Sequence, residues 1–153
     1  MLGEPDLVDG VGFGGNRHHG SALGGRHLGQ LGSDELIARA DALVTNIRPA
    51  ALERLGFGYE ACKALNPKII YAAATGFGQD GPWAKRPAFD EIVQASSGLA
   101  SSIGSDEEPA FVPSLVGDKL CGLALAGAVA AALVYRERTG KGQLVEVPML
   151  ETV

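Results

Sequence analysis

Length, composition and charge place this chain among globular proteins. Its 153 residues are enough for one domain with a hydrophobic core. A content of 46% hydrophobic and 20% charged residues is ordinary for a soluble protein. The net charge of −5 argues against unspecific binding to nucleic acid, so no nucleic-acid partner is expected. The amino terminus lacks the basic and apolar regions of a signal peptide, which predicts a cytoplasmic protein.

The first 32 residues differ in composition from the rest. They contain ten of the 22 glycines and all three histidines, His18, His19 and His27. A G-x-G-x-x-G pattern at 10–15 follows no convincing strand and precedes no helix, and no metal-ligand spacing joins the histidines to Cys, Asp or Glu. We interpret residues 1–32 as a flexible, degenerate Gly-rich segment before a domain at 33–153, and expect no metal site.

From Ser33 onward, helical and strand patterns alternate along the chain. Ser33 is expected to cap the first helix, and the short apolar run after it is expected to be a buried strand. The predicted helices cover 33–40, 48–56, 58–66, 89–99 and 118–138, and the predicted strands cover 41–46, 68–75 and 144–150. This order indicates an α/β fold, in which a Rossmann-like parallel sheet is flanked by helices.

A second G-x-G-x-x-G pattern, from Gly76 to Gly81, follows a predicted strand. In a dinucleotide-binding turn the third glycine opens a helix. Here Pro82 and Pro87 follow, and interior prolines disfavour a helix. No acidic residue ends a second strand at the distance a dinucleotide site needs. We therefore interpret these glycines as a loop that serves another purpose.

The segment 120–135 is uncharged but has only 16 residues, fewer than the roughly 20 that span a membrane. We predict a continuous, largely buried helix over 118–138 and no membrane partner. Its small residues at Gly122, Ala126 and Ala130 would let another backbone approach closely. The two cysteines, Cys62 and Cys121, match no zinc or redox spacing and are expected to be buried, reduced thiols.

Four motifs follow one another along the chain: NIRPAALERLG, LNPKIIY, GFGQDGP and VGDKLCGLALAG. In these motifs the chain resembles the family III CoA-transferases, which include formyl-CoA and carnitine CoA-transferases and the related α-methylacyl-CoA racemases. The resemblance extends over residues 35–153. It degrades before Ser33, and family members are longer, so we expect a truncated member. The Gly76–Gly81 loop then resembles the family's glycine turn after a sheet strand.

The resemblance implies a role for Asp118. From the residues alone, an aspartate before a long apolar helix is more typical of an N-cap. Its position matches the family's catalytic aspartate, which attacks an acyl-CoA thioester and passes through an aspartyl anhydride and an aspartyl-CoA thioester. A helix N-terminus would favour the carboxylate charge, so the two interpretations are compatible.

The resemblance also implies a binding site for coenzyme A as co-substrate. The matching positions are Asn46, Ile47, Arg48, Arg54, Arg86 and Phe89. Without the family resemblance, these arginines and Lys85 would be interpreted as solvated surface charges. The expected function is CoA transfer between an acyl-CoA and a carboxylic acid, in a homodimer of interlocked chains.

Two alternatives to an active CoA-transferase stay open. The first is an inactive fragment that binds CoA or a partner polypeptide, and the second is an acyl-CoA racemase. A racemase is disfavoured because that branch has a histidine base before an aspartate, whereas this chain has Phe89 before Asp90.

Overall fold

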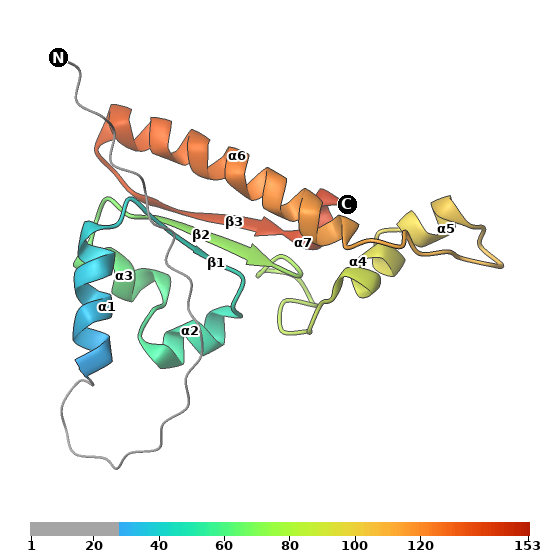
Figure 1. Cartoon of the computed structure of the whole chain (residues 1–153), viewed down its shortest axis with the longest axis horizontal. Helices are drawn as coiled ribbons and strands as arrows, with labels where there is room; N and C mark the ends of the chain where they lie inside the picture. Colours follow the sequence, from blue (N-terminus) through green and yellow to red (C-terminus); the bar gives the residue numbers. More distant parts are fainter. Residues whose placement is uncertain (1–27) are drawn as a thin grey trace, which may run out of the picture.

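Three parallel strands form the sheet at the centre of the molecule (Figure 1). The computed structural model describes residues 28–153. Strand β1 (Ala42–Thr45) and strand β3 (Gln143–Pro148) each pair in parallel with the central strand β2 (Ile70–Thr75). The α/β class and the parallel sheet expected from the sequence are confirmed.

Helices cover both faces of this sheet. Helices α1, α2 and α3 lie on one face, and the long helix α6 lies along the other (Figure 1). The helices in the described part of the chain are α1 (Leu28–Arg39), α2 (Pro49–Leu55), α3 (Tyr59–Leu65), α4 (Asp90–Ser96), α5 (Leu99–Ile103), α6 (Val116–Thr139) and α7 (Met149–Thr152).

Several helix boundaries differ from the sequence prediction. Helix α7 includes residues 149 and 150, which were predicted to end a strand, and α6 begins at Val116, two residues earlier than predicted. Helix α1 begins at Leu28, so Ser33 lies inside it and is not its cap. The domain division expected between residues 32 and 33 stays a prediction, and the histidines and the glycine pattern at 10–15 lie outside the described residues. The helix expected over 89–99 is two helices, because Gly98 adopts a left-handed conformation with φ of 85° between α4 and α5.

Strand β2 supplies side chains to a core on each face of the sheet. On one face Tyr71 and Ala73 pack with Ile37, Leu52 and Cys62. On the opposite face the buried cluster consists of Ala72, Cys121, Leu125 and Val147. Strand β1 was expected to be buried, and this prediction was wrong: it is an edge strand, and Val44 is 60% exposed.

Helix α6 is continuous over its 24 residues, as predicted, but it is not largely buried. Its buried residues are Gly117, Cys121, Leu125 and Ala132. One face packs on β2 and β3, while Leu123 on the other face is 74% exposed. No atom lies within 4 Å of a Cβ built on Gly122, so the expected close backbone approach is absent there in the described residues. By length and composition α6 is one helix that would be able to cross a membrane.

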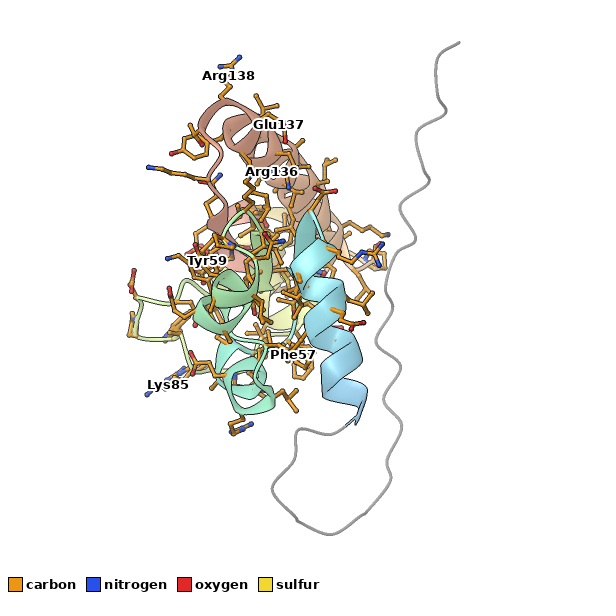
Figure 2. The ribbon with its side chains drawn as sticks, turned by 90° about the vertical axis from the view of Figure 1, so that its left-hand side faces the viewer. Phe57, Tyr59, Lys85, Arg136, Glu137 and Arg138 are labelled. Atoms are coloured by element: carbon orange, nitrogen blue, oxygen red, sulfur yellow. The ribbon has the colours of Figure 1, made fainter. Side chains whose placement is uncertain are left out.

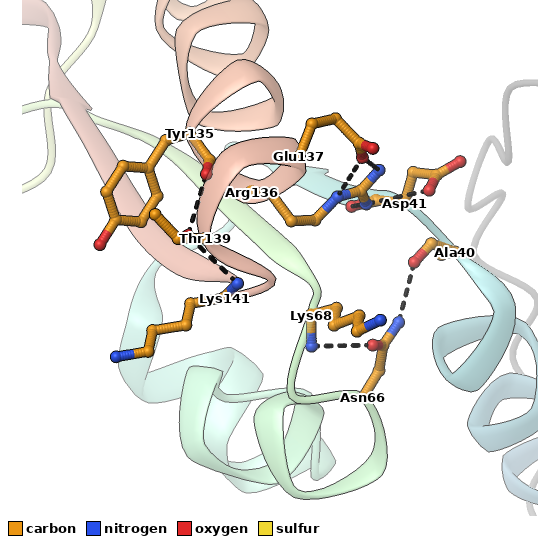
Figure 3. A network of polar contacts seen from close by, with 9 residues as sticks. All are labelled: Ala40, Asp41, Asn66, Lys68, Tyr135, Arg136, Glu137, Thr139 and Lys141. Atoms are coloured by element: carbon orange, nitrogen blue, oxygen red, sulfur yellow. Dashed lines mark hydrogen bonds and ion pairs between the residues drawn. The ribbon is translucent and has the colours of Figure 1, made fainter.

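Polar contacts tie α6 to the sheet at the amino ends of the strands (Figure 3). Arg136 pairs with Asp41 at 2.9 Å and with Glu137 at 3.1 Å. Burial lowers the pKa of Arg136, but hydrogen bonds to Glu137 and Asp41 outweigh this effect and leave the pKa raised. Nearby, the Asn66 amide donates to the Ala40 carbonyl at 2.9 Å. Figure 2 shows Arg136 and Glu137 at the end of α6.

Alanine substitutions at two glycines are expected to change the stability of the fold in opposite directions. A Cβ on Gly142 would overlap the backbone around Ile69, whereas nothing lies within 4 Å of a Cβ on Gly127 in α6. We expect Gly142→Ala to destabilise the fold by about 1–3 kcal/mol and Gly127→Ala to stabilise it by up to about 1 kcal/mol. Urea unfolding of both variants measures the difference. Equal effects of the two changes would contradict the packing described here.

The buried Tyr71 hydroxyl is expected to contribute to stability only while it is protonated, so this contribution is lost at alkaline pH. This hydroxyl donates to the Phe57 carbonyl at 2.8 Å. Burial, and then the nearby Cys62 and Glu53, raise its pKa to about 12. Because the pKa of Tyr71 is higher in the folded than in the unfolded chain, its contribution to the free energy of unfolding is complete below about pH 10. This contribution is lost as the pH rises through 12. We expect the free energy of unfolding to fall less steeply between pH 10 and 12 in Tyr71→Phe than in the parent chain; an identical fall would contradict this.

Candidate active site

The carboxyl ends of the three strands meet the start of α6 at one edge of the sheet (Figure 1). The chain leaves β1 at Asn46 and β2 at Gly76. It leaves β3 directly into α7, where the Leu150 amide donates to the Gly76 carbonyl at 3.2 Å. In open α/β sheets ligands bind outside this edge, so the candidate site is built from the segments that converge there.

The glycine loop after β2 makes a close contact and opens no helix. Residues 76–89 contain turns and bends, as the prolines predicted. A Cβ on Gly76 would overlap Ala88, so the glycine is needed for the close approach of two chain segments. Among the described glycines a positive φ occurs only at Gly56, Gly98 and Gly140, so the loop does not use that freedom. The loop is not a dinucleotide-binding turn.

Asp118 lies in the first turn of α6 with an exposed side chain. Within the described part of the chain, its carboxylate has no hydrogen bond or ion pair. The neighbouring Lys119 points elsewhere, because its ammonium group donates to the Ser114 hydroxyl at 2.6 Å. The expectation that Lys119 leaves the carboxylate unpaired is confirmed, and the Asp118 carboxylate is open to a reactant from solvent.

The N-cap interpretation of Asp118 was wrong. Helix α6 begins at Val116, its N-cap residue is Leu115, and no side chain of that residue caps the helix. Asp118 is the third helical residue, so its amide is one of the groups that lack a partner within the helix. That amide instead donates to the Asp90 carboxylate at 2.9 Å.

Asp90 is the residue that sequence reasoning missed. It was noted only as the neighbour of Phe89, yet it is 3% exposed and contacts the first turn of α6. An aspartate at the start of a predicted helix is usually interpreted as an exposed first-turn residue. The two positions are 28 residues apart, and no local signal joins them.

The residues matched to CoA binding fall into two exposed groups. Asn46, Ile47 and Arg48 follow β1, and the Ile47 amide donates to the Thr45 hydroxyl at 3.1 Å. Arg48 occupies the N-cap position of α2, and Arg54 lies in the last turn of that helix.

The second group precedes α4. Arg86 lies over the Trp83 ring at 5.5 Å, and Phe89 is 66% exposed at the N-cap position of α4. In the described residues, no hydrogen bond or ring contact joins this group to the residues of α2. Lys85, beside Arg86, extends from the molecule's surface (Figure 2).

A hollow of about 550 Å³ lies beside the glycine loop. Phe77 and Trp83 form part of its wall, with ring centroids 5.3 Å apart, but Glu146 and Glu151 also line it. These carboxylates would repel phosphate groups, so the hollow is unsuited to the charged part of CoA. Asp118 does not line this hollow. The expectation that the Asp118 side chain opens into a cleft stays a prediction.

Neither cysteine competes with Asp118 as a nucleophile. Cys62 and Cys121 are free and buried, as expected. Burial raises the pKa of both thiols, with the charge of Asp118 adding to the effect at Cys121. Both are therefore protonated at neutral pH. The described residues contain no group of three His, Cys, Asp or Glu side chains arranged to hold a metal ion.

Comparison with known proteins decides the family. The model of CoA-transferase family III matches residues 27–153. The chain belongs to this family. An acetyl-CoA:oxalate CoA-transferase of Acetobacter aceti is 44% identical over 122 residues, which are 76% of this chain and 31% of that protein. A succinate–glutarate CoA-transferase of Agrobacterium fabrum is 38% identical over 117 residues, covering 76% of this chain and 29% of the relative.

Solved structures agree with the sequence relationship. A CAIB/BAIF family protein from Brucella suis is similar, with a TM-score of 0.79, 34% sequence identity, and coverage of 83% of this chain and 34% of that one. The family III chain described here therefore spans about a third of the length of the relatives it matches.

Proposed function

We propose that this family III chain takes part in CoA transfer between an acyl-CoA thioester and a carboxylic acid, with Asp118 as the nucleophile. The observation that supports this most directly is the exposed, unpaired Asp118 carboxylate in the first turn of α6. It lies at the carboxyl edge of a parallel sheet, where ligands of such folds bind. Its position also matches the family's catalytic aspartate.

The proposed reaction passes through three covalent intermediates, which are two mixed anhydrides and one aspartyl-CoA thioester. An Asp118 oxygen attacks the thioester carbonyl, the C–S bond breaks, and CoA leaves as a thiolate, giving a mixed anhydride. The thiolate attacks the aspartyl carbonyl, which releases the donor acid and leaves an aspartyl-CoA thioester. An acceptor carboxylate then attacks the aspartyl carbonyl of this thioester, which expels the thiolate and gives a second mixed anhydride. The thiolate attacks the acceptor's acyl carbon in this anhydride, which releases the new acyl-CoA and regenerates the Asp118 carboxylate. Dividing one exchange into such steps is covalent catalysis by a carboxylate.

Coenzyme A is the proposed co-substrate, and exposed cations near the carboxyl edge support its binding. Arg48 is the N-cap residue of α2, which begins close after β1; Arg54 lies in the last turn of that helix, and Arg86 lies in the loop after β2. The phosphates of CoA favour such guanidinium groups. Asn46, Ile47 and Phe89 are the proposed contacts to the uncharged parts of the molecule.

A homodimer is the proposed assembly, as the family resemblance implies, and the cytoplasm is the proposed location. Exposed apolar side chains near the start of α6, including Leu115, Leu120 and Leu123, support burial against further protein. Because the chain spans a third of its relatives, an inactive fragment that binds CoA or a partner remains the second candidate. Racemisation has no support, since Phe89 cannot act as a base.

Trapping with hydroxylamine tests the nucleophile. We expect acetyl-CoA and oxalate, the pair named for the Acetobacter aceti relative, to yield a hydroxamate at Asp118, located by peptide mass spectrometry. Asp118→Asn and Asp118→Ala should abolish both trapping and transfer, because neither side chain supplies a carboxylate. The matched control Asp106→Asn removes an exposed acid from a distant loop and should change neither.

The outcomes separate the candidate functions. A hydroxamate at Asp90 or Glu91, or full transfer by Asp118→Asn, would refute the mechanism. CoA binding without trapping or transfer would favour the inactive fragment.

Charge reversal tests the CoA site. We expect Arg48→Glu and Arg54→Glu each to weaken CoA binding by about tenfold, since one unit charge near a phosphate contributes about 1 kcal/mol or more at the surface. The control Arg138→Glu makes the same charge change at the far end of α6 (Figure 2). Isothermal titration with free CoA measures the affinities. Equal weakening by all three variants would indicate a net-charge effect and no local site.

A further inference from the structure

Asp90 is a buried acid without a cation. It is 3% exposed, and no ion pair to it occurs among the residues the structure describes. A buried carboxylate is costly unless hydrogen bonds satisfy it. Here Oδ2 accepts the Asp118 amide at 2.9 Å, and Oδ1 accepts the Gln94 side-chain amide at 2.6 Å. The positive end of a 24-residue helix supplies the remaining compensation.

Gln94 extends this contact to the segment that leads into α6. It is 1% exposed and lies one turn after Asp90 on α4. Its side-chain oxygen accepts the Val112 amide at 2.8 Å, and its amide donates to the Ser114 carbonyl at 3.3 Å. Helix α4 thus holds both the approach to α6 and the first turn of α6, through two buried side chains.

The packing at Gly117 shows how closely the two helices fit. A Cβ at this position would lie 3.2 Å from Asp90 Oδ2 and 3.2 Å from the sulfur of Met149. Contacts this short leave little room for a side chain. The residue before Asp118 is therefore fixed between the buried carboxylate and the start of α7.

We infer that Asp90, supported by Gln94, is the positioning residue for Asp118, an inference that rests on the proposed role of Asp118 as nucleophile. Asp90 acts through the backbone: it fixes the Asp118 amide and so the point from which the Asp118 side chain projects. It also takes over the capping that Leu115 cannot provide. The Asp118 carboxylate is thereby free for chemistry and is not needed to satisfy its own helix.

The test compares Asp90→Ala and Asp90→Asn with the control Glu91→Gln, an exposed acid on the same helix. We expect Asp90→Ala to speed hydrogen exchange of the Asp118 amide by about tenfold or more, because a hydrogen bond to a charged group is lost. The rate of hydroxamate formation at Asp118 should fall by a similar factor, while the affinity for free CoA stays unchanged. Asp90→Asn keeps an oxygen acceptor and should lie between parent and Asp90→Ala.

Each outcome is decisive. Unchanged exchange of the Asp118 amide in Asp90→Ala, or a trapping rate that falls no more than in Glu91→Gln, would overturn the inference. If Asp90→Ala does not fold, the same two measurements on Asp90→Asn decide. If the parent chain forms no hydroxamate at Asp118, the proposed function fails and the catalytic role of Asp90 fails with it. The amide exchange then still shows whether Asp90 holds the start of the helix.

Discussion

The central strand of a three-strand parallel sheet must be buried on both faces, and the rest of this structure follows from that constraint. Strand β2 pairs with both edge strands, and Ile70, Ala72 and Tyr71 are almost fully inaccessible. Each face therefore needs a helical layer. The parallel direction requires each connection to return along a face of the sheet, which is why helices lie between successive strands. All three strands consequently deliver their carboxyl ends to one edge.

Helix α6 brings a second requirement to that edge. Its first amides lack partners within the helix, and its N-cap residue Leu115 has no polar side chain. The buried Asp90 carboxylate from α4 satisfies one of them, while Arg136 and Asp41 fasten the opposite end of the helix. A helix held at both ends presents Asp118 at a defined position without using its side chain. Structural stabilisation and the proposed chemistry are thus assigned to different carboxylates.

Helix α6 presents apolar side chains on a face that the described structure leaves exposed. A helix that is apolar on most sides is normally buried on most sides, yet Leu123 and Val134 are exposed in the described structure. The relatives are about three times longer than the matched region. The sheet covers one face of the helix only, and burial of the other face against further protein is part of the proposed homodimer.

The sequence determined the α/β class, the order of the three strands and of the helices α1, α2, α3 and α6 among them, and the ends of α2. These are properties of local pattern: apolar periodicity sets strand and helix, Pro49 begins α2, and Gly56 ends it with a positive φ. The loop interpretation of Gly76–Gly81 was also correct, because two prolines exclude the helix that a dinucleotide turn requires. The family motifs singled out Asp118, although its role in catalysis stays a proposal.

Only the tertiary structure decided burial and capping. An apolar stretch does not reveal whether one face or two will be covered, so the exposure of Val44 and of most of α6 was missed. A local pattern also cannot pair Asp90 with an amide 28 residues away, so the cap of α6 was assigned to the wrong aspartate. Both depend on which elements the sheet brings together. That arrangement is set by packing between distant segments, and no window of the sequence contains it.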